Sequence, residues 1–219
     1  PVEGQIEDLL GEIRTRIDSV QQTLKITNAM YLISSTKMRQ ARKKLADAEP
    51  YFYKLQAEIA RILRHMPEVS NQYFDSREEI PKEERKIGSV VITGDKGLAG
   101  AYNHNVLKMA QEWMEQGDNH RLYVVGELGR HYFASKHIPV EEQFHYTVQN
   151  PTMHRARLIS STVLEDYEQG QLDEVWILYT QMINSMKMEA EIVQLLPLKR
   201  EDFSNIVIPP DIIQEEIQM

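Results

Sequence analysis

The glycine-rich segment GDKGLAG, residues 94–100, has the residue spacing most similar to that of a phosphate-binding site. It directly follows the β-branched run of residues 89–93, and phosphates bind helix N-termini where such strands end. The segment lacks the GxGxxG spacing of dinucleotide sites and the Gly-Lys-Ser/Thr ending of a P-loop. A phosphate loop therefore remains an alternative to the favoured interpretation. That interpretation is a structural turn, with glycines for tight backbone angles and close helix packing, made by Gly94, Asp95, Gly97 and Gly100.

The remaining candidates for catalysis or metal binding are weak. Asp95 could act as an acid or base, but nothing pairs with it at a diagnostic spacing. The seven histidines include no HExxH, and Glu141, Glu142 and His145 are too loosely spaced for a metal site. There is no Gly-x-Ser-x-Gly elbow and no cysteine. The sequence predicts a chain that is not itself an enzyme and has no catalytic residue, cofactor or metal.

A basic patch lies within the first third of the chain, at Lys37, Arg39, Arg42, Lys43 and Lys44. It is either a solvated helix flank, a contact for acidic loops of a partner protein, or a nucleic-acid contact. The net charge of -8 and the lack of an accompanying aromatic set argue against nucleic acid. A protein partner and a solvated flank both remain open.

These residues lie on one very long predicted helix. Alternate steps of three and four residues select an apolar stripe whose members are Leu10, Ile13, Ile17, Val20, Leu24, Thr27, Tyr31, Ser34, Met38, Ala41, Leu45, Ala48, Phe52, Leu55, Ile59, Ile62 and Met66. A period of 3.5 residues sustained over about eight heptads is typical of a coiled coil. We expect a kink or brief break near Ala48 to Pro50, with two joined helices as the alternative.

The length of this helix implies a partner. About 60 helical residues measure about 90 Å, whereas a compact domain made by the rest of the chain is about 35 Å across. A projecting stripe about 10 Å wide would expose on the order of 900 Å², more than the few hundred Å² usual for a soluble monomer. We expect another chain, a second copy, or a continuation outside this sequence to cover it.

The rest of the chain predicts an α/β fold with a largely parallel sheet. Strands are expected at 89–93, 121–125, 174–182 and 189–197, with 144–148 either a strand or an extended loop. Helices are expected around Val106 to Trp113, at 127–136 and at 151–169. The predicted organisation is a helix over 1–67, a solvated linker over 68–87, an α/β domain over 88–208, and the start of another helix over 209–219.

Composition adds two expectations. No run approaches the 18 or more apolar residues of a membrane span, so no direct membrane insertion is expected. No signal peptide heads the sequence, which predicts a protein that stays where it is made or has already lost a targeting segment.

Two separate motifs resemble one family. Residues 13–41, IRTRIDSVQQTLKITNAMYLISSTKMRQA, resemble the N-terminal helix of the gamma subunit of F-type ATP synthases. Residues 90–106, VVITGDKGLAGAYNHNV, are similar to the family's first strand and turn. The departures are Asn28 for a common basic residue, Gly94 for Ser, Lys96 for Arg and Ala99 for the frequent Cys.

The resemblance implies a non-catalytic rotor subunit with a long coiled-coil helix and a Rossmann-like α/β domain. It implies as partners the alpha and beta ATPase subunits, the epsilon subunit and the membrane ring of subunit c, on the cytoplasmic face of the bacterial plasma membrane. Ion flow would turn the membrane ring and the shaft together. The turning shaft would then take each catalytic site through states of different nucleotide affinity. The implied torque-transmitting contacts are Ile26, Thr27, Ala29, Met30, Lys37 and Arg39.

The family's long C-terminal helix is missing beyond Met219, so we expect either a truncated product or a related protein. The alternative function is a free-standing gamma-like module that dimerises or docks through its long helix. A nucleotide-binding enzyme that uses residues 94–100 is a second rival.

Overall fold

The computed structural model describes residues 2–117 and 119–206. It contains a helical unit, which includes residues 2–65, and an α/β unit of residues 66–205. The helix start expected at 209–219 lies outside the described residues.

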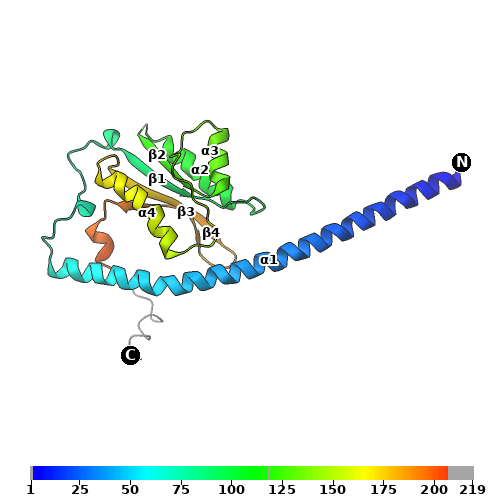
Figure 1. The fold of residues 1–219 in the computed structure, drawn as a ribbon, viewed down its shortest axis with the longest axis horizontal. Helices are drawn as coiled ribbons and strands as arrows, with labels where there is room; N and C mark the ends of the chain where they lie inside the picture. The colour runs from blue at the N-terminus through cyan, green and yellow to red at the C-terminus, as the bar shows by residue number, and fades with distance from the viewer. Residues whose placement is uncertain (1, 118, 207–219) are drawn as a thin grey trace, which may run out of the picture. The chain divides into compact units, whose positions relative to one another are not determined.

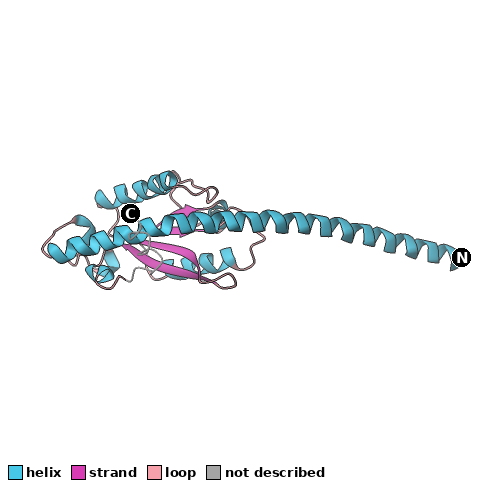
Figure 2. Cartoon of the chain, turned by 90° about the horizontal axis from the view of Figure 1, so that it is seen from below, coloured by secondary structure: helices cyan, strands magenta, loops and turns pink. Residues whose placement is uncertain are grey.

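The helix described in the helical unit is α1, from Val2 to His65 (Figure 2). It is continuous through Pro50, so neither a break near Ala48 to Pro50 nor the alternative of two joined helices occurs. A proline removes one amide hydrogen bond, and the long run of bonded turns on each side keeps the helix together. Every member of the apolar stripe from Leu10 to Leu55 is exposed. The predicted stripe is therefore present and uncovered in the single chain.

The α/β unit is built on four strands: β1 (Ile87–Ile92), β2 (His120–Val125), β3 (Glu174–Met182) and β4 (Met188–Leu196). Their order is β2-β1-β3-β4 (Figure 1). β1 pairs in parallel with β2 and β3, whereas β3 and β4 form an antiparallel hairpin. The expected strands are confirmed. The segment at 144–148 is extended and makes an isolated bridge between Tyr146 and Val125.

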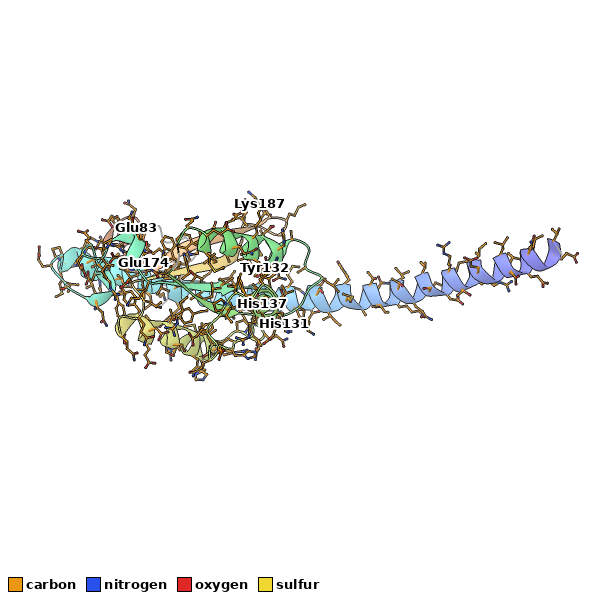
Figure 3. The ribbon with its side chains drawn as sticks, turned by 90° about the horizontal axis from the view of Figure 1, so that it is seen from above. Glu83, His131, Tyr132, His137, Glu174 and Lys187 are labelled. Atoms are coloured by element: carbon orange, nitrogen blue, oxygen red, sulfur yellow. The ribbon has the colours of Figure 1, made fainter. Side chains whose placement is uncertain are left out.

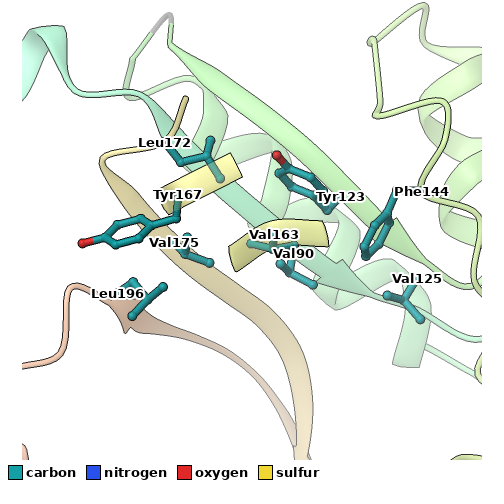
Figure 4. Close-up of a cluster of buried hydrophobic side chains, with 9 residues drawn as sticks. All are labelled: Val90, Tyr123, Val125, Phe144, Val163, Tyr167, Leu172, Val175 and Leu196. Atoms are coloured by element: carbon teal, nitrogen blue, oxygen red, sulfur yellow. The ribbon is translucent and has the colours of Figure 1, made fainter. Parts of the chain in front are cut away.

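Helices cover both faces of this sheet. The elements are α2 (Tyr102–Met114), α3 (Glu127–Ser135), α4 (Met153–Glu168), and short 3₁₀ turns η1 (Gln72–Phe74), η2 (Lys82–Glu84) and η3 (Arg200–Phe203). On one face Val163 and Tyr167 of α4 pack on Val90, Tyr123 and Val175 (Figure 4). On the other face, α2 and α3 pack on the sheet through a second buried cluster, Val91, Val106, Leu107, Ala110, Leu122, Val124, Phe133 and Leu178. These layers confirm the predicted α/β class and the largely parallel sheet.

The range 68–87 differs from the solvated linker that we expected. Arg77 forms an ion pair with buried Asp173, with 2.7 Å between Nη1 and Oδ1, and its guanidinium lies 4.2 Å from the Tyr167 ring centre. Asp173 also accepts a hydrogen bond from the Lys86 backbone amide at 2.9 Å. Arg85 pairs with Glu174 at 3.0 Å. A long charged side chain can pack on a domain when its charge is paired, so this segment belongs to the α/β unit.

Candidate functional site

The glycine-rich turn lies at the carboxyl end of β1, and its polar groups are used internally. The amide of Gly94 donates to Asn103 Oδ1 of α2 at 2.7 Å. The carboxylate of Asp95 accepts hydrogen bonds from the backbone amides of Glu127, at 3.1 Å, and Val148, at 3.2 Å. Asp95 therefore joins three segments at this end of the sheet. Because two backbone amides donate to its carboxylate, Asp95 has the role of a residue that holds loops in place.

The tip of the same turn displays an apolar side chain. Leu98 has a φ of 59° and is 94% exposed, and Gly100 follows with a φ of 56°. Holding a leucine in the left-handed region costs roughly 1–2 kcal/mol. Backbone strain of this kind clusters at functional sites, so Leu98 is a candidate contact residue. Leu98 was not among the predicted functional residues, because its only signal in the sequence is its position among closely spaced glycines.

The loose acidic and histidine cluster separates in the structure. Glu141 pairs with Arg121 at 2.7 Å, and His145 pairs with Glu127 at 2.5 Å. The hydrogen bond from His145 lowers the pKa of the Glu127 carboxyl. Among residues 2–117 and 119–206 there is no group of three or more His, Cys, Asp or Glu side chains arranged to hold a metal ion.

The residues implied for torque transmission all lie on α1 and are exposed: Ile26, Thr27, Ala29, Met30, Lys37 and Arg39. Thr27 Oγ1 donates to the carbonyl of Thr23 at 2.8 Å, which leaves its methyl group on the surface. At 100° per residue, Ile26, Met30 and Lys37 fall on one face of the helix. Within the described residues, neither Lys37 nor Arg39 has an ion pair.

One short stretch of α1 is apolar on every side. Met30, Tyr31, Leu32 and Ile33 are 45, 71, 65 and 58% exposed. Four consecutive helical positions point in directions about 100° apart, so together they surround the helix axis. A helix that is apolar all round is normally buried all round. This stretch therefore needs partners on several sides of the helix, and not only along the apolar stripe.

An aromatic cluster lies at the amino end of the sheet. The rings of Trp113 and Trp176 are 4.8 Å apart, and His120 meets Trp113 edge-on at 5.6 Å. Neither ring nitrogen of His120 has a hydrogen-bond partner among the described residues, and both are enclosed. Burial lowers the pKa of this imidazole. Nothing in the local sequence around His120 or the two tryptophans indicated that they would meet.

The His120 environment predicts a pH dependence of stability. Because the folded-state pKa is below the ordinary value of about 6.5, the unfolded chain binds more protons between these two values. Stability should therefore fall as the pH drops through that window, for instance from about pH 7 to about pH 5.5. Thermal unfolding of the full chain followed by tryptophan fluorescence measures this fall.

The fall should be smaller in His120→Gln, which removes the titrating ring. His131→Gln, at an exposed position on α3, is the matched control and should retain it. An equal pH dependence in wild type and His120→Gln would contradict the assignment.

No helix within the described residues is long and apolar enough to cross a membrane. α1 is long enough to cross a membrane, but charged residues occur along its whole length.

Comparison with known proteins gives one consistent family. The family model described as ATP synthase matches residues 9–218. The ATP synthase gamma chain of Ruminiclostridium cellulolyticum is 46% identical over 200 residues, which cover 88% of this chain and 67% of the relative. That of Acetivibrio thermocellus is 41% identical over 190 residues, covering 87% and 64%. That of Caldanaerobacter subterraneus is 40% identical over 205 residues, covering 94% and 69%.

The chain thus spans 64 to 69% of the length of these relatives. The family model covers most of the chain, and it includes both the α1 motif and the glycine-rich turn. The chain therefore belongs to the ATP synthase gamma chain family.

Proposed function

We propose that this chain is the central rotor subunit of an F-type ATP synthase. In this role it transmits torque between an ion-driven membrane ring of subunit c and a catalytic ring of alpha and beta subunits, and it performs no catalysis itself. The epsilon subunit is a further partner. The proposed location is peripheral, on the cytoplasmic face of the bacterial plasma membrane, as part of the complex.

The observation that carries this proposal is the exposed apolar surface of α1. The apolar stripe needs one covering partner along its length, as in a coiled coil. Residues 30–33 need cover on all sides, which a single partner helix does not provide. A shaft inside the bore of a protein ring meets both requirements, because a ring encloses the helix while a second helix covers the stripe.

The chemistry of the rest of the chain agrees with a mechanical role. Asp95 is held by backbone amides, Glu141 pairs with Arg121, and His145 pairs with Glu127. The basic residues Lys37 and Arg39 are exposed on α1 and suit acidic loops of a beta subunit.

Substitutions on α1 test the proposed contacts. Met30→Lys places a charge where the ring would bury it, and the double reversal Lys37→Glu with Arg39→Glu sets like charges against acidic loops. An unpaired charge buried by Met30→Lys costs about 3–5 kcal/mol, and the lost charge pairs of the double reversal cost about 2–5 kcal/mol. ATP-driven ion pumping should therefore fall about tenfold or more in both variants. The measurement is pumping into vesicles by the assembled complex.

The matched controls keep the chemistry of each position. Met30→Leu preserves the apolar surface, and Lys37→Arg with Arg39→Lys preserves the charge, so both should pump normally. Unchanged pumping in Met30→Lys and in the charge reversal would count decisively against these contacts.

The native mass of the protein captured from mildly solubilised source membranes tests the function as a whole. A complex that contains alpha and beta ATPase subunits is the expected result. A species near 25.5 kDa or twice that mass, without ATPase partners, would instead support the free-standing module.

A further inference from the structure

A cavity of about 770 Å³ opens at the amino end of the parallel strands. All of its lining residues belong to the α/β unit, and among them are Phe74, Trp113, His120, Trp176, Gln194 and Leu198. It forms beside the end of α2, which contributes Trp113 to the lining. Figure 3 shows Glu174, at the start of β3, far from His131 and His137 on the other side of the unit. The volume matches the 300–1,000 Å³ typical of small-molecule sites.

Two tryptophans form part of the cavity wall. Trp113 comes from α2 and Trp176 from β3, and their rings pack at 4.8 Å with an angle of 50°. Their indole N–H groups are already used: Trp113 donates to Ser89 Oγ at 3.1 Å, and Trp176 to Glu174 Oε2 at 2.8 Å. These bonds fix both rings, so the walls present preorganised surfaces on which a planar molecule can stack.

The arginines and the buried glutamate of the cavity are bonded to other protein groups. Arg85 and Glu174, whose side chains are 15% and 13% exposed, pair at 3.0 Å. Arg85 also donates to the carbonyls of Ile80, at 3.0 Å, and Arg77, at 3.1 Å. Since Glu174 also accepts from Trp176, neither charge is left for a ligand. Arg200, also in the lining, donates to the carbonyls of Pro67, at 3.0 Å, and Val69, at 2.5 Å. The other charged lining residues are Lys82, Lys199, Glu78 and Glu201.

Two neutral amide side chains also line the cavity. Gln194 spends one amide hydrogen bond on the Leu196 carbonyl, at 3.2 Å, and Gln116 adds a second amide to the lining. From the aromatic walls, the internal ion pair and these amides, we propose that the cavity binds an uncharged, planar heteroaromatic molecule. Its ring would stack on the tryptophans and its edge would bond to the amides. This site lies at the opposite end of the sheet from the glycine-rich turn and does not depend on the proposed rotor function.

Adenine is a suitable probe, because it is planar, uncharged at neutral pH, and carries donors and acceptors on its edge. The chain has two tryptophans, Trp113 and Trp176, and both line the cavity. Intrinsic fluorescence of the full chain therefore reports on this site alone. We expect saturable quenching by adenine, with matching shifts of both indole N–H resonances in NMR spectra.

Variants locate the binding. Trp176→Leu should weaken adenine binding about tenfold or more, since stacking on one aromatic side chain contributes that much in base recognition. Gln194→Leu should weaken it without changing the fold, which far-UV circular dichroism checks. Met186→Ala, at a 93% exposed residue of the β3–β4 hairpin, is the matched control and should bind as wild type does.

Three outcomes would overturn the proposal. The first is an absence of saturable quenching up to the solubility limit of adenine. The second is binding that Trp176→Leu and Gln194→Leu leave unchanged, which would place the site elsewhere. The third is ATP binding much more tightly than adenine, since a phosphate-dependent site contradicts an uncharged ligand.

Discussion

Gly126→Ala is expected to destabilise the α/β unit severely. Gly126 follows β2 with a φ of 104°, a backbone conformation that side chains rarely adopt. A Cβ atom there would lie 2.4 Å from the carbonyl oxygen of Thr93 and 2.5 Å from its Oγ1. Thr93 is fully buried and its amide donates to the Val125 carbonyl at 2.9 Å, so it cannot move aside.

The expected magnitude follows from two costs that add. Strain at a glycine-only conformation costs about 1–3 kcal/mol, and overpacking costs about 1–3 kcal/mol. Their sum is a large part of the roughly 5–15 kcal/mol that stabilises a typical domain. The unfolding midpoint of the full chain, followed by tryptophan fluorescence, should fall by on the order of 10–20 °C.

Gly97→Ala is the matched control for this prediction. Gly97 lies in the exposed turn, and a Cβ atom there would meet nothing within 4 Å. Its midpoint should stay close to that of wild type. A normal midpoint for Gly126→Ala would mean that the ends of β1 and β2 do not approach each other as the structure describes.

Local patterns were enough to predict most elements. The 3.5-residue period of the apolar stripe identified α1, because helix geometry alone brings those positions to one side. β-branched runs bounded by glycine identified β1 and β2, and the residues predicted for β3, 174–182, match its observed bounds. These signals lie within a few residues of one another, so the sequence displays them directly.

Long-range contacts were not predictable in the same way. The segment 68–87 looked solvated because its charges were visible and their partners, Asp173 and Glu174, are almost a hundred residues away. The same is true of Trp113 and Trp176, which come from different elements. The role of Asp95 depends on amides at 127 and 148. The exposed Leu98 depends on a backbone angle that residue identity does not specify.

Replacing Ile13, Ile17, Val20 and Leu24 together by glutamine is expected to abolish assembly with the alpha and beta subunits. All four side chains belong to the apolar stripe and are 50 to 67% exposed in the chain alone. Burying one such side chain stabilises an assembly by about 1.5–3 kcal/mol, so four give roughly 6–12 kcal/mol. Glutamine has a helix propensity close to that of leucine, so α1 should persist. Co-purification of tagged chain with the ATPase subunits measures the loss.

The opposite face of α1 provides the control, through Thr15→Ala, Asp18→Ala and Gln22→Ala in one chain. At 100° per residue these positions point away from the stripe, so assembly should be largely retained. Thermal unfolding of the α/β unit should be unchanged in both variants, because its core contains no stripe residue. Normal assembly of the glutamine variant would show that the stripe is uncovered in the working protein, and a rotor shaft built on α1 would then be untenable. Loss of self-association without loss of ATPase partners would instead assign the stripe to a second copy of the chain.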